Sequence, residues 1–472
     1  MILLPVYLVL VCLALYLTLA VGYVIFLAAA YFAVPEREYD KPAERVRFAV
    51  LVPAHDEELL IGRLCRSLLE VRYPRDLFAV YVVADNCSDR TAAVCGEYPV
   101  NVIERRDQDH AGKGHAISWA VGKIPLERFD AVLIVDADNI VDPGILEELN
   151  LMINGGEQAI QCHNAVGNRD DSWFTQLLYV SRTMCNHLYH HSKYKLGLSS
   201  YLMGNGICFT TGLLGAKGWT AFSVGEDWEY YAQLIGDGKR IGFALRAKVF
   251  HQESRSLAQA TPQRLRWSSG RFQVLKRYGF GLLVRGLVSR DLFTVDASMP
   301  LVSPNYSLQI NLTVLLLLAA LLLPSTNLAR LIVFVSLLLL AAQVMLFVLG
   351  VYLSGSAWKV VRARPVASVV ALVGLTLPRS LWNCTVTPAT EHNYRNHLTP
   401  WREFWRLLFL ERFLPLATYP MHRWGTSEPR EVEVIKGACL LLRRSSLDQV
   451  GLFDERYFMY SEEMDLCHRL AH

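Results

Sequence analysis

Acidic side chains follow three apolar runs of the sequence, each at the point where the run ends. They are Asp56 and Glu57 after 48–54, Asp85 after 78–84, and Asp136 and Asp138 after 131–135. Asp136 and Asp138 alternate in an extended turn, so their carboxylates could converge on one hard cation that also binds phosphate oxygens. Asp is also a common turn and cap residue, and Asp56 and Asp85 could instead cap the helices that follow them. Capping and nucleotide binding are compatible.

A lysine between two glycines, Lys113, lies between the second and third acid turns. Glycine lets the backbone approach a ligand and lysine supplies a point charge for phosphate, but the Walker spacing of a P-loop is absent. The spacing therefore argues against a P-loop nucleotidase. Two interpretations of Lys113 stay open, namely contact with a donor diphosphate or a solvated loop charge.

Three further motifs follow in the next part of the chain. They are Gly204-Asn205-Gly206, Glu226-Asp227 and Gln263-x-x-Arg266-Trp267. The first could be only a tight turn, and the second only the acidic first turn of a helix. The third is rarer, because one helix face offers an amide, a planar cation and an indole, which suit a sugar diphosphate beside an aromatic platform. An Arg-Trp pair on a helix could also be an interface anchor beneath a membrane domain.

Short β-rich runs that alternate with helical patterns must position these side chains. The run 48–54, for example, is followed by leucines at helical spacing from Leu59 to Leu68. Strands that alternate with helices predict an α/β, Rossmann-like fold with a mostly parallel sheet and helices on both faces. Ligands of such sheets bind outside the carboxyl ends of the strands. The acid turns therefore fall at the predicted ligand-binding edge.

A long uncharged segment at the start of the chain predicts a membrane anchor. No charged residue occurs from Met1 to Phe32, and about 20 apolar residues suffice to cross a bilayer. A secretory signal is the alternative, but it would have a basic start and a shorter apolar core of about 7–15 residues. Basic residues follow between Arg37 and Arg47, and by the positive-inside rule they place the next domain in the cytoplasm.

A second apolar block predicts a helical hairpin. It runs from Leu308 to Leu323, breaks at 324–327, and resumes from Leu331 to Leu353. Basic residues follow it, which returns the chain to the same side of the membrane. The stretch 366–377 is too short to span with certainty and could be an interfacial helix or part of a fourth span.

Composition excludes several classes of protein. The 472 residues are 52% hydrophobic and 19% charged, with a formal net charge of +3, whereas soluble domains carry about 25% charged residues. This excludes a disordered or fibrous chain, and the small net charge gives no support to a nucleic-acid partner. Ten cysteines without a C-x-x-C pair argue against a zinc ribbon or a disulfide framework and predict reduced core residues.

Taken together, the motifs resemble glycosyltransferase family 2. Within it they resemble the membrane-bound synthase-like branch that includes cellulose, chitin, hyaluronan and poly-N-acetylglucosamine synthases. The resemblance covers about residues 46–278, and the motifs occur in the family's order. It implies a GT-A fold, a nucleotide-diphosphate sugar donor that is most often a UDP-sugar, Mg²⁺ or Mn²⁺ as cofactor, and inversion at the anomeric carbon.

The same resemblance implies a role for each motif residue. The donor would contact Asp56, Glu57, Asp85, Lys113, Asp136, Gln263, Arg266 and Trp267. The acceptor would lie near Gly204, Asn205, Gly206 and Trp267. Asp138 would ligate the metal with Asp136 beside it, and Asp227 would be the catalytic base with Glu226 as its neighbour.

The sequence departs from the family's pattern at two motif positions and in its membrane region. His55 stands where many members have Asn, and Gly225 stands where Thr is commoner; both changes are conservative in role. Cellulose-synthase-type channels use more membrane spans than the three or four expected here. Single transfer to a lipid-linked acceptor, and synthesis of a polysaccharide with a partner export channel, therefore both stay open.

Two other classes of protein compete with an enzyme. A non-catalytic nucleotide-sugar-binding or scaffold subunit of a synthase complex is the alternative, but it would be free to lose the base or the metal turn, and both are intact. A transporter ranks last, because the expected spans lack interior charges and internal symmetry. The expected location is the plasma membrane, with several spans and a cytoplasmic catalytic domain.

These interpretations divide the chain into five parts. They are an anchor at 1–34, a GT-A glycosyltransferase domain at 45–290, a hairpin with a possible further span at 300–380, an amphipathic membrane-surface segment at 390–425, and a truncated second transferase-like fragment at 431–472. The segment 390–425 has aromatic residues at helical spacing beside arginines, and could instead pack on the catalytic domain.

The final fragment resembles the acceptor half of a second, rhamnosyltransferase-like family 2 enzyme. Glu462, Glu463 and Asp465 fall where the first copy has Glu226, Asp227 and Glu229. The fragment has no strand-end acids of its own and no donor half. We therefore expect it to be inactive.

Overall fold

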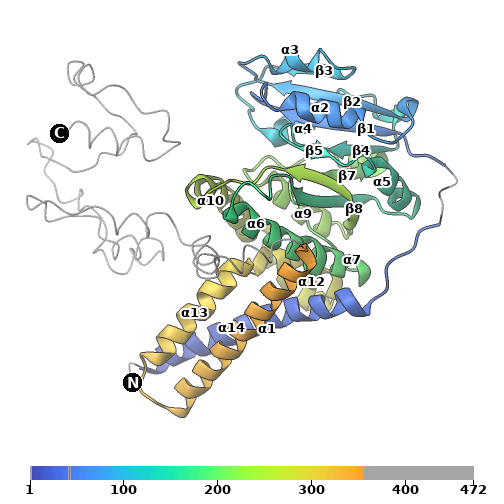
Figure 1. Ribbon diagram of the computed structural model, residues 1–472. Helices are drawn as coiled ribbons and strands as arrows, with labels where there is room; N and C mark the ends of the chain where they lie inside the picture. The colour runs from blue at the N-terminus through green and yellow to red at the C-terminus, as the bar shows by residue number, and fades with distance from the viewer. Residues whose placement is uncertain (1–2, 41, 43, 304, 356–472) are drawn as a thin grey trace, which may run out of the picture. The chain divides into compact units, whose positions relative to one another are not determined.

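The computed structural model describes residues 3–40, 42, 44–303 and 305–355. Three sequence predictions lie outside these residues, namely the interfacial helix or fourth span at 366–377, the amphipathic segment at 390–425 and the fragment at 431–472. They stay predictions. The described part contains one mixed sheet with helices on both faces and a group of long apolar helices (Figure 1).

The sheet has eight strands in the order β3-β2-β1-β4-β7-β6-β8-β5. Their bounds are β1 Phe48–Ala54, β2 Phe78–Asp85, β3 Asn101–Arg105, β4 Ala131–Ile134, β5 Ile140–Val141, β6 Ala159–Val166, β7 Ile207–Thr210 and β8 Gly242–His251. The half made of β3, β2, β1 and β4 is wholly parallel. In the other half β7 and β5 run antiparallel to their neighbours, whereas β6 and β8 are parallel. The predicted mostly parallel α/β sheet is confirmed.

Register explains why the acid turns meet at one edge. Val50 of β1 pairs with Val80 of β2 on one side and with Leu133 of β4 on the other. Because all three strands run in the same direction, the residues that follow them leave the sheet at the same edge. All seven residues of β1 and all four of β4 are buried, as expected for strands covered on both faces.

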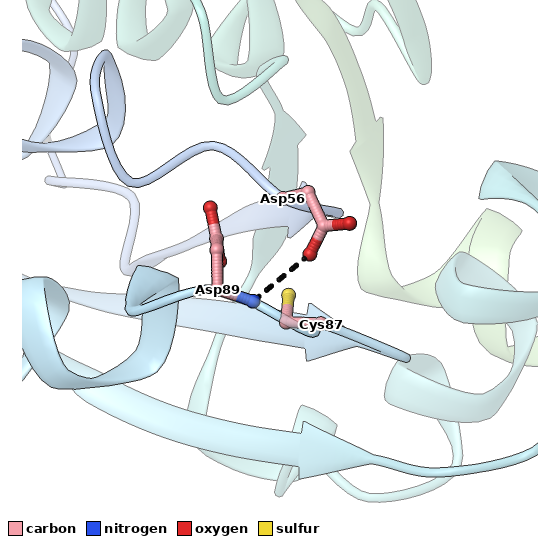
Figure 2. Close-up of side chains that lie close together, drawn as sticks. All are labelled: Asp56, Cys87 and Asp89. Atoms are coloured by element: carbon pink, nitrogen blue, oxygen red, sulfur yellow. Dashed lines mark hydrogen bonds between the residues drawn. The ribbon is translucent and has the colours of Figure 1, made fainter. Parts of the chain in front are cut away.

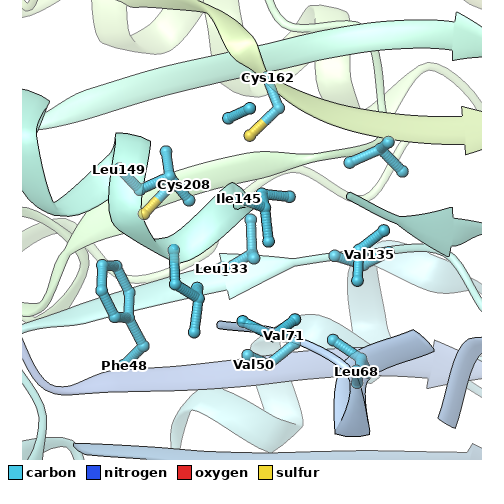
Figure 3. Packing of buried hydrophobic residues seen from close by; sticks show 14 of the residues in the cluster. Phe48, Val50, Leu68, Val71, Leu133, Val135, Ile145, Leu149, Cys162 and Cys208 are labelled. Atoms are coloured by element: carbon cyan, nitrogen blue, oxygen red, sulfur yellow. The ribbon is translucent and has the colours of Figure 1, made fainter. Parts of the chain in front are cut away.

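Alternate residues of these strands pack into two separate cores. Val50 and Leu133 point to one face, where they pack with Ile145 and Leu149 of α5 (Ile145–Asn154), as Figure 3 shows. Leu51 lies in the core on the other face. That second core includes residues of α4 (Lys113–Val121), α8 (Thr211–Lys217) and α9 (Glu226–Gly236). The two-residue period of a strand therefore sorts its side chains between the two faces.

Among the described residues, two helices are long and apolar enough to cross a membrane. They lie within α1 (Leu3–Ala33) and α14 (Asn327–Ser354). A third candidate is the pair α12 (Leu292–Val302) and α13 (Tyr306–Leu321), which bends by 74° at the break between them. The hairpin expected at 308–323 and 331–353 corresponds to α13 and α14, which pack on each other and on α1.

The apolar helices are attached to the sheet unit by a helical segment with π-type turns, η3 (Met184–His191), between α6 (Trp173–Thr183) and α7 (Ser192–Lys195). His191 Nε2 lies 2.8 Å from a carboxylate oxygen of Glu36. Lys193 is completely buried, and its ammonium lies 3.0 Å from the carboxylate of Asp296 in α12. Because breaking a buried ion pair is costly, this pair ties α12 to α7 beside the sheet.

Candidate functional site

The first residues of α9 carry the predicted catalytic acids. The Asp227 carboxylate accepts a hydrogen bond from the backbone N–H of Trp228 at 2.8 Å. Gly204 leaves room for it, because a Cβ there would lie 3.1 Å from Asp227 Oδ2. Burial and the neighbouring charge of Glu226 raise the pKa of Asp227 to about 7. Asp227 can therefore exchange a proton near neutral pH, as a general base requires.

Lys113 connects this acid pair to the turn after β4, which carries Asp136 and Asp138. It is the first residue of α4, and its ammonium lies 2.5 Å from Asp136 Oδ1 and 3.6 Å from Glu226 Oε1. It also donates to the backbone carbonyl of Gly204. Although burial opposes the charge, Asp136 and Glu226 raise the pKa of Lys113. Lys113 is thus paired with these acids and is not a solvated loop charge, and its contact with a donor diphosphate stays a prediction.

The turn after β4 brings further carboxylates together. Burial and the charge of Asp136 raise the pKa of Asp138, although its side chain reaches solvent. Burial, followed by Asp138 and Asp136, raises the pKa of Glu57 to about 7. These like charges oppose one another, and in the part of the chain that the structure describes Lys113 supplies the ammonium that pairs with Asp136 of this turn. A bound cation would relieve that repulsion.

His251, at the end of β8, is a functional candidate that the sequence analysis missed. Its Nε2 lies 3.0 Å from Glu253 Oε1, whereas its buried Nδ1 has no hydrogen-bond partner. His251 also acts electrostatically on Asp138. The carboxylates of Asp136 and Asp138 are the oxygen ligands that Mg²⁺ and Mn²⁺ prefer. These acids therefore fit a divalent metal, His251 is a further candidate because it acts on Asp138, and its strand-end position was the signal that could have revealed it.

The loops after β1 and β2 hold a second group of acids, shown in Figure 2. Ligand atoms of Asp56, Cys87 and Asp89 lie within 4.8 Å of one another. The Asp56 carboxylate accepts from the Ser88 N–H at 2.7 Å and the Asp89 N–H at 3.3 Å, and the Ser88 bond lowers the pKa of Asp56. Asp89 in turn accepts from the N–H groups of Thr91 and Glu58. These carboxylates tie two loops together. Neither Asp56 nor Asp85 caps the helix that follows it, because α2 (Ile61–Leu69) and α3 (Thr91–Cys95) begin after Leu60 and Arg90 without a side-chain cap.

Asp85 occupies a buried ion pair. Arg105 Nη1, at the end of β3, lies 2.6 Å from Asp85 Oδ1. Arg105 also reaches Asp107 at 2.9 Å and donates to the carbonyl of His110. Its Nε is buried without a partner. No motif indicated this arginine, since the pairing depends on the neighbouring strand. The donor contact at Asp85 stays a prediction.

The Gly-Asn-Gly motif supports the turn after β4 that carries Asp136 and Asp138. Asn205 is buried, and its Oδ1 accepts from the backbone N–H of Asp136 at 3.2 Å. Its Nδ2 donates to Asn164 Oδ1 of β6, also at 3.2 Å. Gly206 has a φ of +64°, and a Cβ there would lie 2.8 Å from Val249. Asn205 and Gly206 therefore position Asp136 and the sheet, while Gly204 borders Asp227.

The Gln-x-x-Arg-Trp motif lies on α10 (Leu257–Val274). Gln263, Arg266 and Trp267 are all exposed, and the Arg182 guanidinium lies 5.9 Å from the Trp267 ring. The helix approaches Glu226 and Asp227 through two glycines, because a Cβ on Gly225 would lie 3.0 Å from the backbone of Gly270. Glycine at both positions lets α10 and the start of α9 touch. The contacts of these three side chains with a donor or acceptor stay predictions.

The chain is similar to known transferases over this region. Residues 45–270 match the family model described as glycosyltransferase like family 2. A beta-monoglucosyldiacylglycerol synthase of Trichormus variabilis is 26% identical over 232 residues, which cover 48% of this chain and 49% of that protein. The structure of a mannosyltransferase from Pyrobaculum calidifontis, in complex with GDP-Man and Mn²⁺, superposes with a TM-score of 0.52 at 19% identity and covers 75% of this chain and 99% of that one.

A short match involves another transferase. The N-acetylglucosaminyl-diphospho-decaprenol L-rhamnosyltransferase of Mycobacterium tuberculosis is 50% identical over 61 residues, which cover 11% of this chain and 20% of that protein. The chain thus spans only a fifth to about half of these two curated relatives. The structural likeness at 19% identity supports the GT-A-like fold.

Proposed function

We propose that the chain is a glycosyltransferase of family 2, whose model residues 45–270 match, and that it moves a sugar from a nucleotide-diphosphate donor to a lipid or lipid-linked acceptor, with inversion. The observation that carries this proposal is Asp227, a carboxylate with a pKa near 7 beside Lys113 and the metal turn. A protein that only binds nucleotide sugars does not need a proton acceptor at this place.

Asp227 would take the proton of the acceptor hydroxyl as that oxygen attacks the anomeric carbon. The bond from the anomeric carbon to the diphosphate oxygen breaks on the opposite side, and the nucleoside diphosphate leaves. Glu226 would hold Lys113 at the edge of the site, where its ammonium faces the departing negative charge. The proton acceptor and the cation therefore belong to one connected group of side chains.

A divalent cation, Mg²⁺ or Mn²⁺, would neutralise the charge of the donor diphosphate when bound. Asp138 would hold it, with Asp136 beside it and His251 as a further ligand. Lys113 then has two tasks, since it offsets the charge of Asp136 and offers an ammonium to phosphate oxygens. The other proposed donor contacts are Asp56, Glu57, Asp85, Gln263, Arg266 and Trp267. A UDP-sugar is the donor we propose.

The proposed acceptor is a membrane lipid or a lipid-linked sugar, and the membrane is the proposed location. Apolar helices α1, α13 and α14 pack together on the unit that contains Asp227. A relative that is 26% identical is named for synthesis of a glucosyl lipid. We propose that the helices span the plasma membrane more than once and that the basic residues after α1 keep the catalytic unit in the cytoplasm. Polysaccharide synthesis would need an export partner.

The test is a transfer assay with detergent-solubilised protein, a panel of radiolabelled nucleotide sugars and total membrane lipids, followed by sizing of the product. We expect one labelled sugar on a lipid-sized product, and no product from the matched variant Asp138→Asn. A long polymeric product would show that the acceptor is a polysaccharide and not a lipid. No transfer from any donor, by protein that still binds a nucleotide sugar, would contradict catalysis and favour a binding role.

A further inference from the structure

The loops after β1 and β2 contain a cysteine that the proposed mechanism does not use. The sulfur of Cys87 and carboxylate oxygens of Asp56 and Asp89 all lie within 4.8 Å of one another. Figure 2 shows this sulfur pointing toward Asp56 of the other loop. Because β1 and β2 are parallel neighbours, the loops that follow them bring these side chains together. We call Asp56, Cys87 and Asp89 the loop cluster.

His55 adds an imidazole nitrogen beside the loop cluster. Its Nδ1 lies 2.7 Å from the backbone carbonyl oxygen of Asp85. Because a carbonyl oxygen can only accept, Nδ1 carries the ring proton, and in the neutral ring the lone pair lies on Nε2. Nε2 lies 3.8 Å from Asp56 Oδ2, and the His55 side chain is 64% exposed. Histidines that bind metals are oriented in this way, with the other ring nitrogen donating to a carbonyl or carboxylate.

The distances suit a tetrahedral ion. Zinc binds sulfur at about 2.3 Å and nitrogen or oxygen at about 2.0–2.2 Å, so two of its ligands lie roughly 3.3–3.7 Å apart. The 3.8 Å between His55 and Asp56 is close to this value, and small side-chain shifts bring the loop cluster to it. Asp56 Oδ2 accepts from the Ser88 hydroxyl and Asp89 Oδ2 from the Glu58 N–H. Each of these oxygens keeps a second lone pair for a metal.

Ligand type separates the loop cluster from the acids of the turn after β4. Thiolate and imidazole ligands favour Zn²⁺, whereas carboxylates without them favour Mg²⁺ and Mn²⁺. Asp136 and Asp138 offer oxygen atoms only, while the loop cluster and His55 together offer sulfur, nitrogen and oxygen. The two groups at this edge of the sheet therefore suit different cations.

We propose that the loop cluster binds Zn²⁺, with His55 Nε2 as the fourth ligand. The Cys87 thiol releases its proton to solvent when the metal binds. The consequence for transfer rests on the proposed function, in which Asp56 contacts the sugar donor. Zinc at the loop cluster occupies that carboxylate and so competes with the donor, whereas Mg²⁺ or Mn²⁺ at Asp138 supports transfer.

The first test measures binding of the metal alone. The full chain in detergent is freed of metal with a chelator, and Co²⁺ is added as a coloured substitute for Zn²⁺. A thiolate bound to Co²⁺ gives a sulfur-to-metal charge-transfer band in the near ultraviolet, which a carboxylate does not give. Cys87→Ser removes the sulfur but keeps a donor for the Ala54 carbonyl, which the Cys87 sulfur contacts at 3.5 Å. The other variants are His55→Asn and two controls, Cys12→Ser at an exposed cysteine and Asp138→Asn.

We expect the thiolate band in the unchanged chain, in Cys12→Ser and in Asp138→Asn, and its loss in Cys87→Ser. Zinc affinity by calorimetry should fall by more than about 100-fold in Cys87→Ser and about tenfold in His55→Asn, because even changes behind a metal ligand cost about 10–100-fold. No band in the unchanged chain, or an equal band in Cys87→Ser, would overturn the proposal.

The second test measures transfer at saturating Mn²⁺ while Zn²⁺ is added. Zinc should raise the KM for the nucleotide sugar and leave kcat unchanged, and Cys87→Ser should need at least about tenfold more Zn²⁺ for the same inhibition. Equal inhibition of the unchanged chain and Cys87→Ser would contradict competition at the loop cluster. A thiolate band without any effect of Zn²⁺ on transfer would support the zinc site and contradict the donor contact at Asp56.

Discussion

Two groups of carboxylates at the same edge of the sheet are in opposite states. In the loops after β1 and β2, Asp56 accepts backbone N–H groups and has a lowered pKa, and Asp85 faces a guanidinium at 2.6 Å. Around α9 and the turn after β4, Glu57 and Asp227 both have a pKa raised to about 7, and burial raises the pKa of Asp138. The first group is stabilised in the charged form. The second group, Glu57, Asp138 and Asp227 with their acidic neighbours, is crowded by like charges, and we call it the crowded group.

The difference shows that the hydrogen-bond donors and cations around a strand-end carboxylate, and not the number of acids, decide its role. A carboxylate that accepts two or three N–H bonds keeps its charge and holds a loop in place. One that shares a single ammonium with its neighbours gains stability from a proton or a metal. The first group is therefore suited to positioning a neutral part of the donor, and the crowded group to metal binding and proton transfer.

The largest effect is expected for Asp138→Asn, which removes one charge from the crowded group. We expect transfer to fall by more than about 10³-fold and the dependence on divalent cations to be lost with it, because an amide cannot replace the carboxylate that holds the metal. The control is Asp170→Asn, at an exposed position. Wild-type turnover of Asp138→Asn in the presence of chelator would show that Asp138 is not a ligand.

The next largest effect concerns stability in the first group. Arg105→Met leaves Asp85 buried without its counter-charge, and removal of one partner from a buried pair costs about 3–5 kcal/mol. We expect a clear drop in melting temperature in detergent. Arg106→Met is the matched control, since its ion pair with Glu104 is exposed at 3.4 Å and such pairs contribute little. Equal melting temperatures for the two variants would mean that the pair at Asp85 is not structural.

The pH dependence should follow the crowded group. Because the pKa of Asp227 is raised to about 7 and the base must be deprotonated, kcat/KM should fall about tenfold per pH unit below 7 and level off above it. Glu57→Gln should keep this acidic limb, although Glu57 titrates in the same range. A profile that stays flat between pH 5 and 8 would rule out Asp227 as the base.

The smallest effect is expected outside both groups. Deletion of 431–472 should leave transfer unchanged, since every side chain of the two groups lies upstream of this fragment. The assay is the same sugar transfer, with membrane insertion of the truncated chain checked first. Loss of activity in an inserted and folded truncation would give the fragment a regulatory or docking role.

The sequence alone predicted the first half of the sheet and its acid turns, because β1, β2 and β4 are local runs with clear ends. It did not predict that β7 runs antiparallel between β4 and β6, since strand pairing depends on residues far apart in the chain. For the same reason the sequence did not indicate the ion pair between Arg105 and Asp85, which lie on neighbouring strands.

The sequence also could not predict which way the side chains of the candidate site point. Asn205 belongs to a motif that suggested acceptor binding, yet its side chain faces inward and holds the backbone of Asp136. His251 is not among the candidates from the sequence, and only the fold places it where its charge acts on Asp138. In both cases the residue type was visible in the sequence, and the direction of the side chain was not.

The central claim is that Asp227 is the base of an inverting transfer, and the most direct measurement is donor affinity by calorimetry together with turnover for Asp227→Asn and Glu226→Gln. Successive residues in a helical turn point about 100° apart, so only one of the two faces the acceptor. We predict normal donor binding in Asp227→Asn with turnover lowered by about 10²–10⁴-fold, and a milder loss in Glu226→Gln. Near-normal turnover in Asp227→Asn, or a larger loss in Glu226→Gln, would contradict the claim.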